Sequence, residues 1–396
     1  MHRRVALPAF AAAVALVAAP AAAVAEEAPA DPSVAQAAAT PSAGADPQAT
    51  TTPSNPTDPG AGSGTGTGTG NGAPSGDPGS SRDDGTSRVN ARAPITRPQV
   101  RRVAGRVGIS FASGVNRVNG TALALPGRDV KITGRVVPFV AGEKVAVRIW
   151  NGSRLAKTVT VRPKPTKTKQ TATFTATFTP GRSGAVKVFA VHTPSPQQSG
   201  FQSKGATLAV VNPMASPGDS GPFVSLLQQK LAALGYAVPQ SGSYDLGTQL
   251  AVEAYRKVLG VSRLQTLDPT VVSRLLSGVG TFHVRFPQHG RHVEANLGQQ
   301  VLALIDNGRV QRIYTTSSGK PSTPTVLGNF RFYWKDWGTN SEGMVDSNYF
   351  IRGYAIHGYA SVPTYAASHG CLRVPVSDAA AIFDWVHVGD QIDVYY

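Results

Sequence analysis

A segment with almost no large apolar side chains, residues 26–98, most strongly limits what this chain can fold into. It consists mainly of Ala, Pro, Gly, Ser, Thr and Asp, and residues 62–70 alternate Gly with Ser or Thr. Such a composition buries too little apolar surface to offset the conformational entropy that is lost on folding. We therefore predict that residues 26–98 form a disordered Ala/Pro/Gly/Ser/Thr-rich linker and that packed cores lie elsewhere in the chain.

The N-terminus has the pattern of a secretory signal peptide over residues 1–25. Basic residues at positions 2–4 precede an apolar run from Val5 to Val17, and Ala23-Val24-Ala25 forms a small-residue cleavage pattern. A membrane anchor is the alternative, but the apolar run is shorter than the roughly 20 residues that a spanning helix needs. No cysteine near this site offers a lipid attachment point. We therefore expect a secreted protein, located in the cell wall or extracytoplasmic space and not spanning the membrane.

The positive charge of the chain, formally +15, is concentrated in one segment. Between Pro98 and Val210 there are eighteen Lys or Arg residues but only two acidic ones, Asp129 and Glu143. Such an excess indicates an anionic partner. Export makes nucleic acid an improbable partner, so we expect no nucleic-acid binding. Anionic wall polymers, phospholipid headgroups and the carboxylates of the wall are the candidates that remain.

Residues 99–212 have the alternating apolar pattern of short β-strands. In residues 144–150, Val145, Val147 and Ile149 are expected on the face toward a core. Regular turn spacing and the lack of a helical period predict a basic all-β domain, an immunoglobulin-like β-sandwich. His192 is expected to be structural or at the surface, and the domain shows no catalytic constellation. The clearest predicted strands are Asp129–Val136, Lys144–Trp150, Ala172–Phe178 and Gly184–Val191.

Residues 213–278 change to a helical period and predict a three-helix bundle. The first helix ends at Gly235 and the second at Gly260, while Asp268 and Pro269 are the N-cap and first position of the third. The apolar residues with i, i+3, i+4 spacing are Phe223, Leu226, Leu227, Leu231 and Leu234, then Leu250, Val252, Ala254, Tyr255 and Val258, then Val271, Val272, Leu275 and Leu276.

This helical segment resembles the helical peptidoglycan-binding domain family. The residues that carry the resemblance are Gly221, Val224, Leu227-Gln228, Leu231, Leu234-Gly235-Tyr236, Tyr244-Asp245, Thr248, Ala251-Val252 and Tyr255. The family's Asp-Gly-x-Phe-Gly turn is represented only by residues 244–247, Tyr-Asp-Leu-Gly. The resemblance implies binding to peptidoglycan, and the alternative is a three-helix spacer without affinity for the wall.

The chain contains a single cysteine, Cys371, in the string Ser-His-Gly-Cys-Leu-Arg at residues 368–373. Secreted proteins usually pair their cysteines, so an unpaired one is either an inert buried thiol or a reactive one. A thiol attacks a carbonyl as the thiolate, and histidine can take its proton near neutral pH. His357 and His369 both lie within fourteen residues of Cys371. The pattern therefore predicts a thiol nucleophile.

Two other interpretations of these residues are disfavoured. Zinc binding would need a fourth ligand and the short spacings of known sites, and one Cys with two His provides neither, so we predict no metal. Papain-type hydrolases place the cysteine far upstream of the histidine, the reverse of the order here. No cofactor is expected for the nucleophilic chemistry.

Residues 279–396 closely resemble the L,D-transpeptidase catalytic domain family. The match is carried by His357-Gly358 and by Ser368-His369-Gly370-Cys371 with Arg373. Further support comes from Thr316-Ser317-Ser318-Gly319-Lys320, Thr323-Pro324-Thr325 and Gly328-Asn329-Phe330. The resemblance implies a β-rich catalytic domain.

The resemblance also implies roles for the residues of the motif. Cys371 is the nucleophile and His357 the base that takes the thiol proton. Ser368 and His369 shape the site, with Ser368 among the substrate-binding residues. Backbone N–H groups near Gly370 and Cys371 are the expected oxyanion donors.

Substrate contacts are expected from residues beside this motif. Arg373 is expected to contact a substrate carboxylate through its planar fork. Gly358 is expected to let the substrate backbone approach closely, next to Tyr359. A tyrosine hydroxyl is a further oxyanion donor in family members, and the spacing does not choose among Tyr349, Tyr354, Tyr359 and Tyr365.

The implied reaction cleaves the bond after the diaminopimelate of a tetrapeptide stem, releases D-Ala and leaves an acyl-thioester on Cys371. The amine of a neighbouring stem then resolves the thioester into a cross-link, which assigns the enzyme to peptidoglycan synthesis, cell wall biogenesis and cell shape and makes it a carbapenem target. Peptidoglycan stem peptides are thus the expected donor and acceptor. The alternatives are an L,D-carboxypeptidase that trims stems with water and a non-catalytic wall-binding scaffold.

The same 118 residues predict several strands and one helix. Asp306-Asn307-Gly308 predicts a hairpin turn, and Ser377 is the expected N-cap of a helix to about Val386 with Asp378 in its first turn. The histidines outside the motif are expected to be structural or at the surface: His283, His289, His292 and His387. The predicted strands are His283–Phe286, Val293–Asn296, Gln300–Asp306, Arg309–Ser317, Gly328–Trp334, Tyr349–His357 and Gln391–Tyr396.

Overall fold

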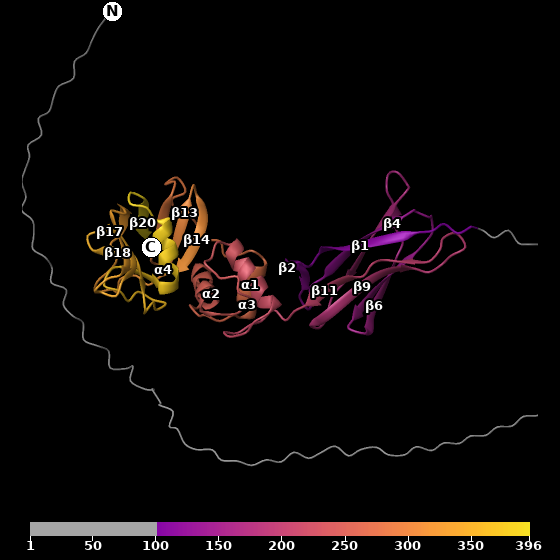
Figure 1. Ribbon diagram of the computed structural model, residues 1–396, viewed down its shortest axis with the longest axis horizontal. Helices are drawn as coiled ribbons and strands as arrows, with labels where there is room; N and C mark the ends of the chain where they lie inside the picture. Colours follow the sequence, from indigo (N-terminus) through magenta and orange to yellow (C-terminus); the bar gives the residue numbers. More distant parts are fainter. Residues whose placement is uncertain (1–100) are drawn as a thin grey trace, which may run out of the picture. The chain divides into compact units, whose positions relative to one another are not determined.

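The computed structural model describes residues 101–396, which belong to one compact unit. The predicted signal peptide, residues 1–25, and the predicted disordered linker, residues 26–98, lie outside the described residues and stay predictions. Figure 1 shows the described chain as strands, then helices, then strands with a further helix. No helix among residues 101–396 has the length and apolar character needed to cross a membrane.

Residues 101–210 form two β-sheets that enclose one core. One sheet has the order β1-β4-β8-β7, and the other has the order β2-β3-β11-β9-β5-β6, with β10 added to β9. Val145, Val147 and Ile149 point into the shared core, as the alternation predicted. The strands are β1 Arg106–Ser113, β2 Asn116–Val118, β3 Thr121–Ala124, β4 Val130–Val137, β5 Val145–Asn151, β6 Arg154–Val161, β7 Lys164–Pro165, β8 Ala172–Phe178, β9 Gly184–His192, β10 Phe201–Gln202 and β11 Ala206–Val210.

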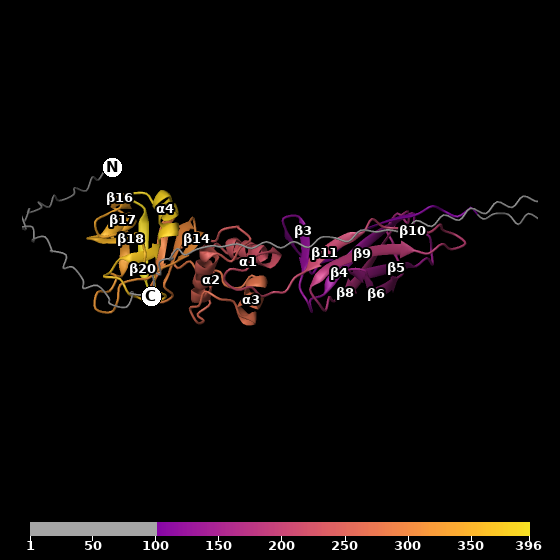
Figure 2. The same cartoon turned by 60° about the horizontal axis from the view of Figure 1, so that its bottom comes forward.

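The three predicted helices are present as α1 Pro222–Ala233, α2 Leu246–Val258 and α3 Pro269–Leu276 (Figure 2). The Asp245 carboxylate accepts from the Thr248 N–H and caps α2. Asp268 caps α3 by accepting from the next two available N–H groups, and Pro269 occupies the first turn. Capping oxygens satisfy N–H groups that a helix start leaves without partners, which explains why these helices begin where they do.

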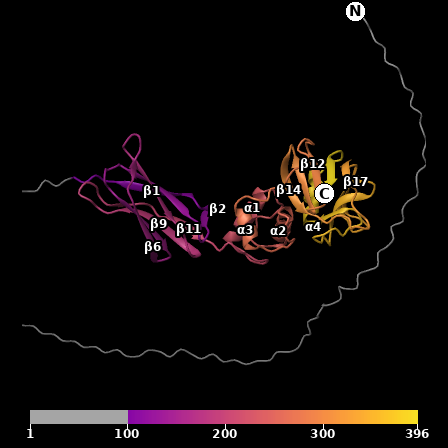
Figure 3. The same cartoon turned by 180° about the vertical axis from the view of Figure 1, so that it is seen from behind.

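The C-terminal part contains two sheets and helix α4, Val376–Trp385. The sheets have the orders β14-β13-β12-β20-β15 and β16-β17-β18-β19. Helix α4 packs against β17 and β18 and is seen from behind in Figure 3. The strands are β12 His292–Asn296, β13 Val301–Asp306, β14 Arg309–Thr315, β15 Gly328–Arg331, β16 Trp334–Thr339, β17 Val345–Ile351, β18 Tyr354–Tyr359, β19 Leu372–Pro375 and β20 Gln391–Tyr395.

The hairpin predicted at residues 306–308 is confirmed. Asn307 and Gly308 both have left-handed φ angles, 48° and 73°, and join the antiparallel strands β13 and β14. Two consecutive residues of this conformation match the twist of the strands they connect, which explains the Asn-Gly sequence.

Four predictions about this part were wrong at the level of single elements. Residues 283–286 form no strand, because the N–H groups of Arg285 and Phe286 donate to the Glu294 carboxylate instead of to a neighbouring strand. Residues 328–334 are not one strand, since β15 pairs with β20 and the chain then crosses to the other sheet, where β16 pairs with β17.

The other two corrections concern turns. Residues 349–357 are not one strand, because Arg352, with φ of 52°, and Gly353 turn the chain back between β17 and β18. Ser377 is not an N-cap: helix α4 begins at Val376, directly after Pro375, and no side chain caps it. Asp378 does lie in the first turn, as predicted.

The helical bundle and the five-stranded sheet that contains β13 and β14 share one hydrophobic core. Ile305 of β13 and Ile313 of β14 belong to the same cluster as Leu231 and Tyr255 of the bundle. The Ile313 N–H donates to the Gly235 carbonyl at 2.8 Å, and the Ala237 N–H donates to the Ile313 carbonyl at 3.0 Å. The chain after α1 therefore extends the β14 edge of the five-stranded sheet.

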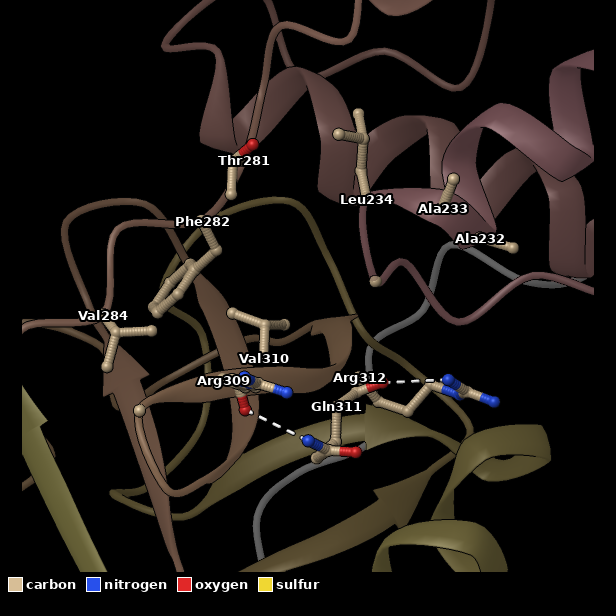
Figure 4. A pocket seen from close by; sticks show the side chains of 12 residues that line it. Ala232, Ala233, Leu234, Thr281, Phe282, Val284, Arg309, Val310, Gln311 and Arg312 are labelled. Atoms are coloured by element: carbon tan, nitrogen blue, oxygen red, sulfur yellow. Dashed lines mark hydrogen bonds between the residues drawn. The ribbon is translucent and has the colours of Figure 1, made fainter. Parts of the chain in front are cut away.

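A surface hollow of about 520 Å³ opens at this junction. Figure 4 shows Leu234, Phe282 and Val310 on its apolar walls, while Arg309 and Arg312 stand on the strand at its rim. The Cβ of any larger residue at Gly235 would come within 2.9 Å of a Val310 methyl group, so this glycine lets the bundle approach β14 closely.

Candidate active site

Cys371 lies just before β19, where this strand pairs in parallel with β18. Its side chain packs against Ala355 of β18 and against Met344 and Tyr349. His357 is two residues beyond Ala355, and side chains two residues apart on a strand point to the same face. Continuing the register in which Ile356 pairs with Leu372, we expect the thiol of Cys371 and the ring of His357 on the same face of the sheet.

The thiol is in a partly buried environment that keeps it protonated. Its sulfur donates to the Gly353 carbonyl at 3.7 Å, and no hydrogen bond joins the described Cys371 and His357 side chains. Burial raises the pKa of Cys371, and the Glu342 charge adds to this effect, while the Ala355 N–H and the Arg373 charge partly oppose it. A neutral thiol is the resting species of this geometry.

His357 is 3% exposed and is fixed in one tautomer by the main chain. Its Nδ1 lies 3.0 Å from the carbonyl oxygen of Gly358, which can only accept, so Nδ1 carries the proton and Nε2 is left as the basic nitrogen. Burial lowers the pKa of His357, and the Arg373 charge lowers it further against the effect of that hydrogen bond. The ring is therefore neutral near pH 7 and able to accept a proton.

Ser368 holds the loop that carries Cys371, the expected nucleophile. Its hydroxyl donates to the Cys371 carbonyl at 2.6 Å and accepts from the Gly370 N–H at 3.0 Å. The Gly370 N–H is thus already bonded within the loop. Of the two expected oxyanion donors, the Cys371 N–H is the one that Ser368 does not bind. Ser368 is 1% exposed, so its hydroxyl acts on the loop in this conformation.

The segment after β14, residues 316–325, forms hydrogen bonds to this loop and to Arg373. Ser317 and Arg373 exchange two main-chain hydrogen bonds of 3.0 Å, and the Lys320 N–H donates to the Ser368 carbonyl at 2.9 Å. The Thr325 hydroxyl accepts from the Gly319 N–H at 2.9 Å and donates to the Gly370 carbonyl at 2.8 Å. The residues that supported the resemblance therefore lie against residues 368–371, which we call the nucleophile loop after the role expected for Cys371.

Arg373, Tyr359 and His357 form a stack beside the thiol. The Arg373 guanidinium lies 4.2 Å from the centre of the Tyr359 ring, and that ring meets the His357 ring edge-on at 5.7 Å. A cation over an aromatic face is held by the ring's negative charge distribution. This arrangement fixes a positive charge near the thiol and near the expected base.

The remaining predicted site residues have different surroundings. His369 is exposed, and its Nε2 lies 3.3 Å from Lys320 Nζ. Gly358 packs under α4, since an added Cβ would come within 2.7 Å of the Ala379 Cβ. Gly370 has φ of 125°, and an added Cβ would overlap the Tyr354 ring. The structure thus brings Cys371, His357, Ser368, Gly370 and Arg373 together and leaves His369 at the rim.

The structure distinguishes the surroundings of the four tyrosines among which the sequence spacing did not choose. Tyr354 lies directly against Gly370, and Tyr349 packs with Cys371 while its ring stacks on Trp334. Tyr359 lies beneath Arg373, and Tyr365 is 63% exposed in the loop before Ser368. Tyr354 is therefore the tyrosine beside the expected oxyanion loop.

Sequence reasoning missed Gln300 as a residue that supports the site. Its amide accepts from the Ser318 N–H and donates to the Ser318 hydroxyl and to the Leu297 carbonyl. It is 3% exposed and has φ of 58°. The polar pair Gln299-Gln300 after Gly298 was the only sequence signal, because nothing along the chain links these residues to Ser318.

The other histidines lie outside this site. His292 is fully buried between Gly290 and Glu294, and His289 lies 2.9 Å from Asp393, so both are structural. His283 and His387 are exposed, and His192 is buried, with Nδ1 2.8 Å from the Lys144 carbonyl oxygen. The part of the chain from residue 101 onward holds no group of three His, Cys, Asp or Glu side chains arranged to bind a metal.

Comparisons with known proteins relate the C-terminal part of the chain to one family. Residues 290–394 match the family model of the L,D-transpeptidase catalytic domain. L,D-transpeptidase 1 of Mycobacterium tuberculosis is 31% identical over 126 residues, which cover 25% of this chain and 48% of that protein. This chain therefore spans about half the length of the curated relative it matches.

Solved structures are similar to this chain over different spans. An L,D-transpeptidase of Xylanimonas cellulosilytica shares 34% identity with a TM-score of 0.44, covering 46% of this chain and 97% of that one. The catalytic domain of an Enterococcus faecium L,D-transpeptidase shares 25% identity with a TM-score of 0.24, covering 27% of this chain and 98% of that one.

Proposed function

We propose that this chain, whose residues 290–394 belong to the L,D-transpeptidase catalytic domain family, is an exported enzyme that cross-links peptidoglycan stems through a thioester on Cys371. The observation that supports the proposal is the packing of Cys371 against Ala355, two residues before His357 on β18, next to the parallel register of β18 and β19. The main chain there leaves the His357 Nε2 as the basic nitrogen.

The proposed acylation moves one proton and exchanges one bond. Substrate binding brings the thiol to His357, whose Nε2 takes the proton as the sulfur attacks the diaminopimelate carbonyl that is bonded to the D-Ala nitrogen of a tetrapeptide. Contacts of this kind are often long without substrate and shorten in the complex. The bond to D-Ala then breaks, and the leaving amine takes the proton back from His357.

The surroundings of the thiol supply the remaining parts of the mechanism. The oxyanion formed during attack is assigned to the Cys371 N–H with help from the Tyr354 hydroxyl. Arg373, fixed over Tyr359, is assigned to a substrate carboxylate. Deacylation reverses the first step, with the amine of a second stem in place of D-Ala. Metal and cofactor play no part in the proposed step.

The accessory segments are proposed to hold the enzyme on the wall. The helical segment 213–278 is assigned to peptidoglycan, and the basic segment 99–212 to anionic wall polymers. In the latter, Asp129 accepts from Thr179, and Glu143 accepts from Ser195 and lies beside His192. No Lys or Arg in the described part of that segment forms an ion pair. Its cations are therefore left for an external anion.

The decisive experiment gives purified protein a soluble fragment that carries tetrapeptide stems and analyses the products. Transfer requires that a bound amine reaches the thioester before water does, which orientation in the site can achieve. We expect dimers linked between two diaminopimelate residues, with tripeptide as a minor product, and an exchanged tetrapeptide when a D-amino acid is added. Tripeptide alone at high acceptor concentration would instead establish the L,D-carboxypeptidase.

A further inference from the structure

Helix α2 carries a buried ion pair at the surface that packs against β14. Lys257 Nζ lies 2.9 Å from Glu253 Oε1, and both side chains are at most 1% exposed. The Thr315 hydroxyl at the end of β14 joins the pair, accepting from Lys257 at 2.5 Å and donating to Glu253 at 2.6 Å. Lys257 also donates to the Thr316 carbonyl at 3.2 Å.

Burying two charges is costly, and apolar residues of similar size often pack as well or better. Packing of the bundle against β14 therefore does not by itself explain this pair. The hydrogen bonds of the pair fix the positions of Thr315 and Thr316. At these residues β14 leads into the segment that contacts the nucleophile loop.

From Thr316 the contacts continue to the candidate active site. The Thr316 hydroxyl donates to the Arg373 carbonyl at 2.8 Å, and Ser317 pairs with Arg373 through the main chain. The Ser317 hydroxyl donates to the Tyr365 carbonyl at 2.6 Å. Lys257 is thus separated from Arg373 by a single residue, Thr316.

A second connection leaves the bundle through Arg263, in the turn after α2. One guanidinium nitrogen donates to the Thr364 carbonyl at 2.6 Å, and the other donates to the Gly298 carbonyl at 2.8 Å. Thr364 belongs to the loop of residues 360–367, which leads directly into Ser368 and Cys371. The planar fork of arginine suits this double contact, which a single ammonium group cannot reproduce.

We propose that the helical segment is a positioning element of the active site, with Lys257 and Arg263 as positioning residues for the loop of Cys371. This inference rests on the proposed function for its kinetic consequence only. A module that merely tethers the enzyme to the wall would affect polymeric substrate alone. A positioning module sets the rate on small soluble substrates as well, because it acts on the geometry of the nucleophile loop.

The test uses the full chain with Arg263→Gln, Arg263→Lys and a matched control, Arg331→Gln. Arg331 also donates to a main-chain carbonyl, that of Gly389, in a loop outside the site. The main measurements are the rate constant for carbapenem acylation, by intact-protein mass spectrometry, and the amide hydrogen exchange of residues 360–373. The steady-state kinetics on a soluble tetrapeptide fragment and the thermal midpoint are measured on the same variants.

We expect Arg263→Gln to lower kcat and the acylation rate constant about tenfold with little change in KM, and to speed exchange in residues 360–373 by a similar factor. Arg263→Lys keeps the charge but loses the planar guanidinium, so its acylation should be as slow as that of Arg263→Gln. Arg331→Gln should acylate at the wild-type rate. A double variant, Lys257→Met with Glu253→Leu, removes both charges together and should slow acylation in the same way.

Unchanged acylation and unchanged exchange in Arg263→Gln would overturn the positioning role. A lower thermal midpoint with a normal acylation rate per folded molecule would overturn it too, because that result describes a purely structural contact. If the wild type itself forms no adduct and turns over no stem, the proposed function fails, and the exchange measurement alone then decides the positioning role.

Discussion

The Thr325→Val variant tests whether the contact of Thr325 with the nucleophile loop controls the loop's reactivity. The Thr325 hydroxyl joins the Gly319 N–H to the Gly370 carbonyl, and the residue is 4% exposed. Valine has nearly the same shape, so the change removes two hydrogen bonds while leaving the packing almost intact.

The magnitude follows from the two groups left without partners. A buried polar group that loses its partner costs about 1–3 kcal/mol, so partial relaxation gives a total of about 2–4 kcal/mol. For a folded unit of this size each kcal/mol lowers the thermal midpoint by about 2–4 °C, which predicts a drop of about 4–16 °C. If about 1.4 kcal/mol of this is needed to order the loop during attack, acylation of Cys371 slows about tenfold.

The assay compares Thr325→Val with Thr325→Ser, which keeps the hydroxyl and loses only a methyl group. Thermal unfolding and the acylation rate by mass spectrometry are measured on both. We expect the serine variant to stay near the wild type in rate. A valine variant with the wild-type midpoint and rate would refute the claim that this hydroxyl holds the loop.

Three further predictions follow from charges and protonation. Because burial raises the pKa of Cys371, its alkylation by iodoacetamide without substrate should be slower at pH 7 than that of free cysteine and should keep rising past about pH 9; a plateau near pH 7 would show a resting thiolate–imidazolium pair instead. Burial raises the pKa of Glu294, but hydrogen bonds from His292, Tyr395 and two N–H groups outweigh this effect, so the pKa is lowered overall. The carboxylate therefore stabilises the fold above its unfolded pKa, and this contribution is lost as the pH falls through its folded pKa. Glu294→Gln should flatten the fall of the thermal midpoint below about pH 4.5, and an unchanged slope would contradict this. The Cys371→Ala chain should bind a phosphodiester wall polymer through the basic segment with an affinity that falls steeply between 0.1 M and 1 M salt, where the Debye length shrinks from about 10 to about 3 Å; salt-insensitive binding would rule out its charge as the contact.

Local patterns in the sequence were sufficient for elements whose causes are local. The alternation of Val145, Val147 and Ile149 predicted the buried face of β5, and the Asp268 cap with Pro269 predicted the first turn of α3. The turn at Asn307-Gly308 was equally readable, since few other pairs tolerate two left-handed residues.

Elements that depend on distant partners could not be predicted in the same way. Nothing local shows that Ser317 pairs with Arg373, or that Arg285 and Phe286 turn their N–H groups to Glu294. The Glu253 and Lys257 pair has the i, i+4 spacing of an exposed helix surface, and charged residues are rarely buried, so no local pattern indicates that both side chains are buried.

The candidate site shows the same division. The short string around Cys371 was enough to propose a nucleophile, its base and its loop, because these residues lie close together along the chain. The choice of Tyr354 over the other tyrosines and the use of the Gly370 N–H by Ser368 both required the folded arrangement. Side-chain roles that depend on the pairing of β18 with β19 can be assigned only from the folded structure.

The central claim, that His357 activates Cys371 as the acyl-transfer nucleophile, is tested most directly by intact-protein mass spectrometry with a carbapenem. The wild type should gain one intact adduct, located on Cys371 by peptide mapping. Cys371→Ala should gain none, and His357→Ala should gain it at least about 10²-fold more slowly, the usual effect of losing a general base. An adduct that forms on Cys371→Ala, or one that forms at the wild-type rate in His357→Ala, would contradict the account.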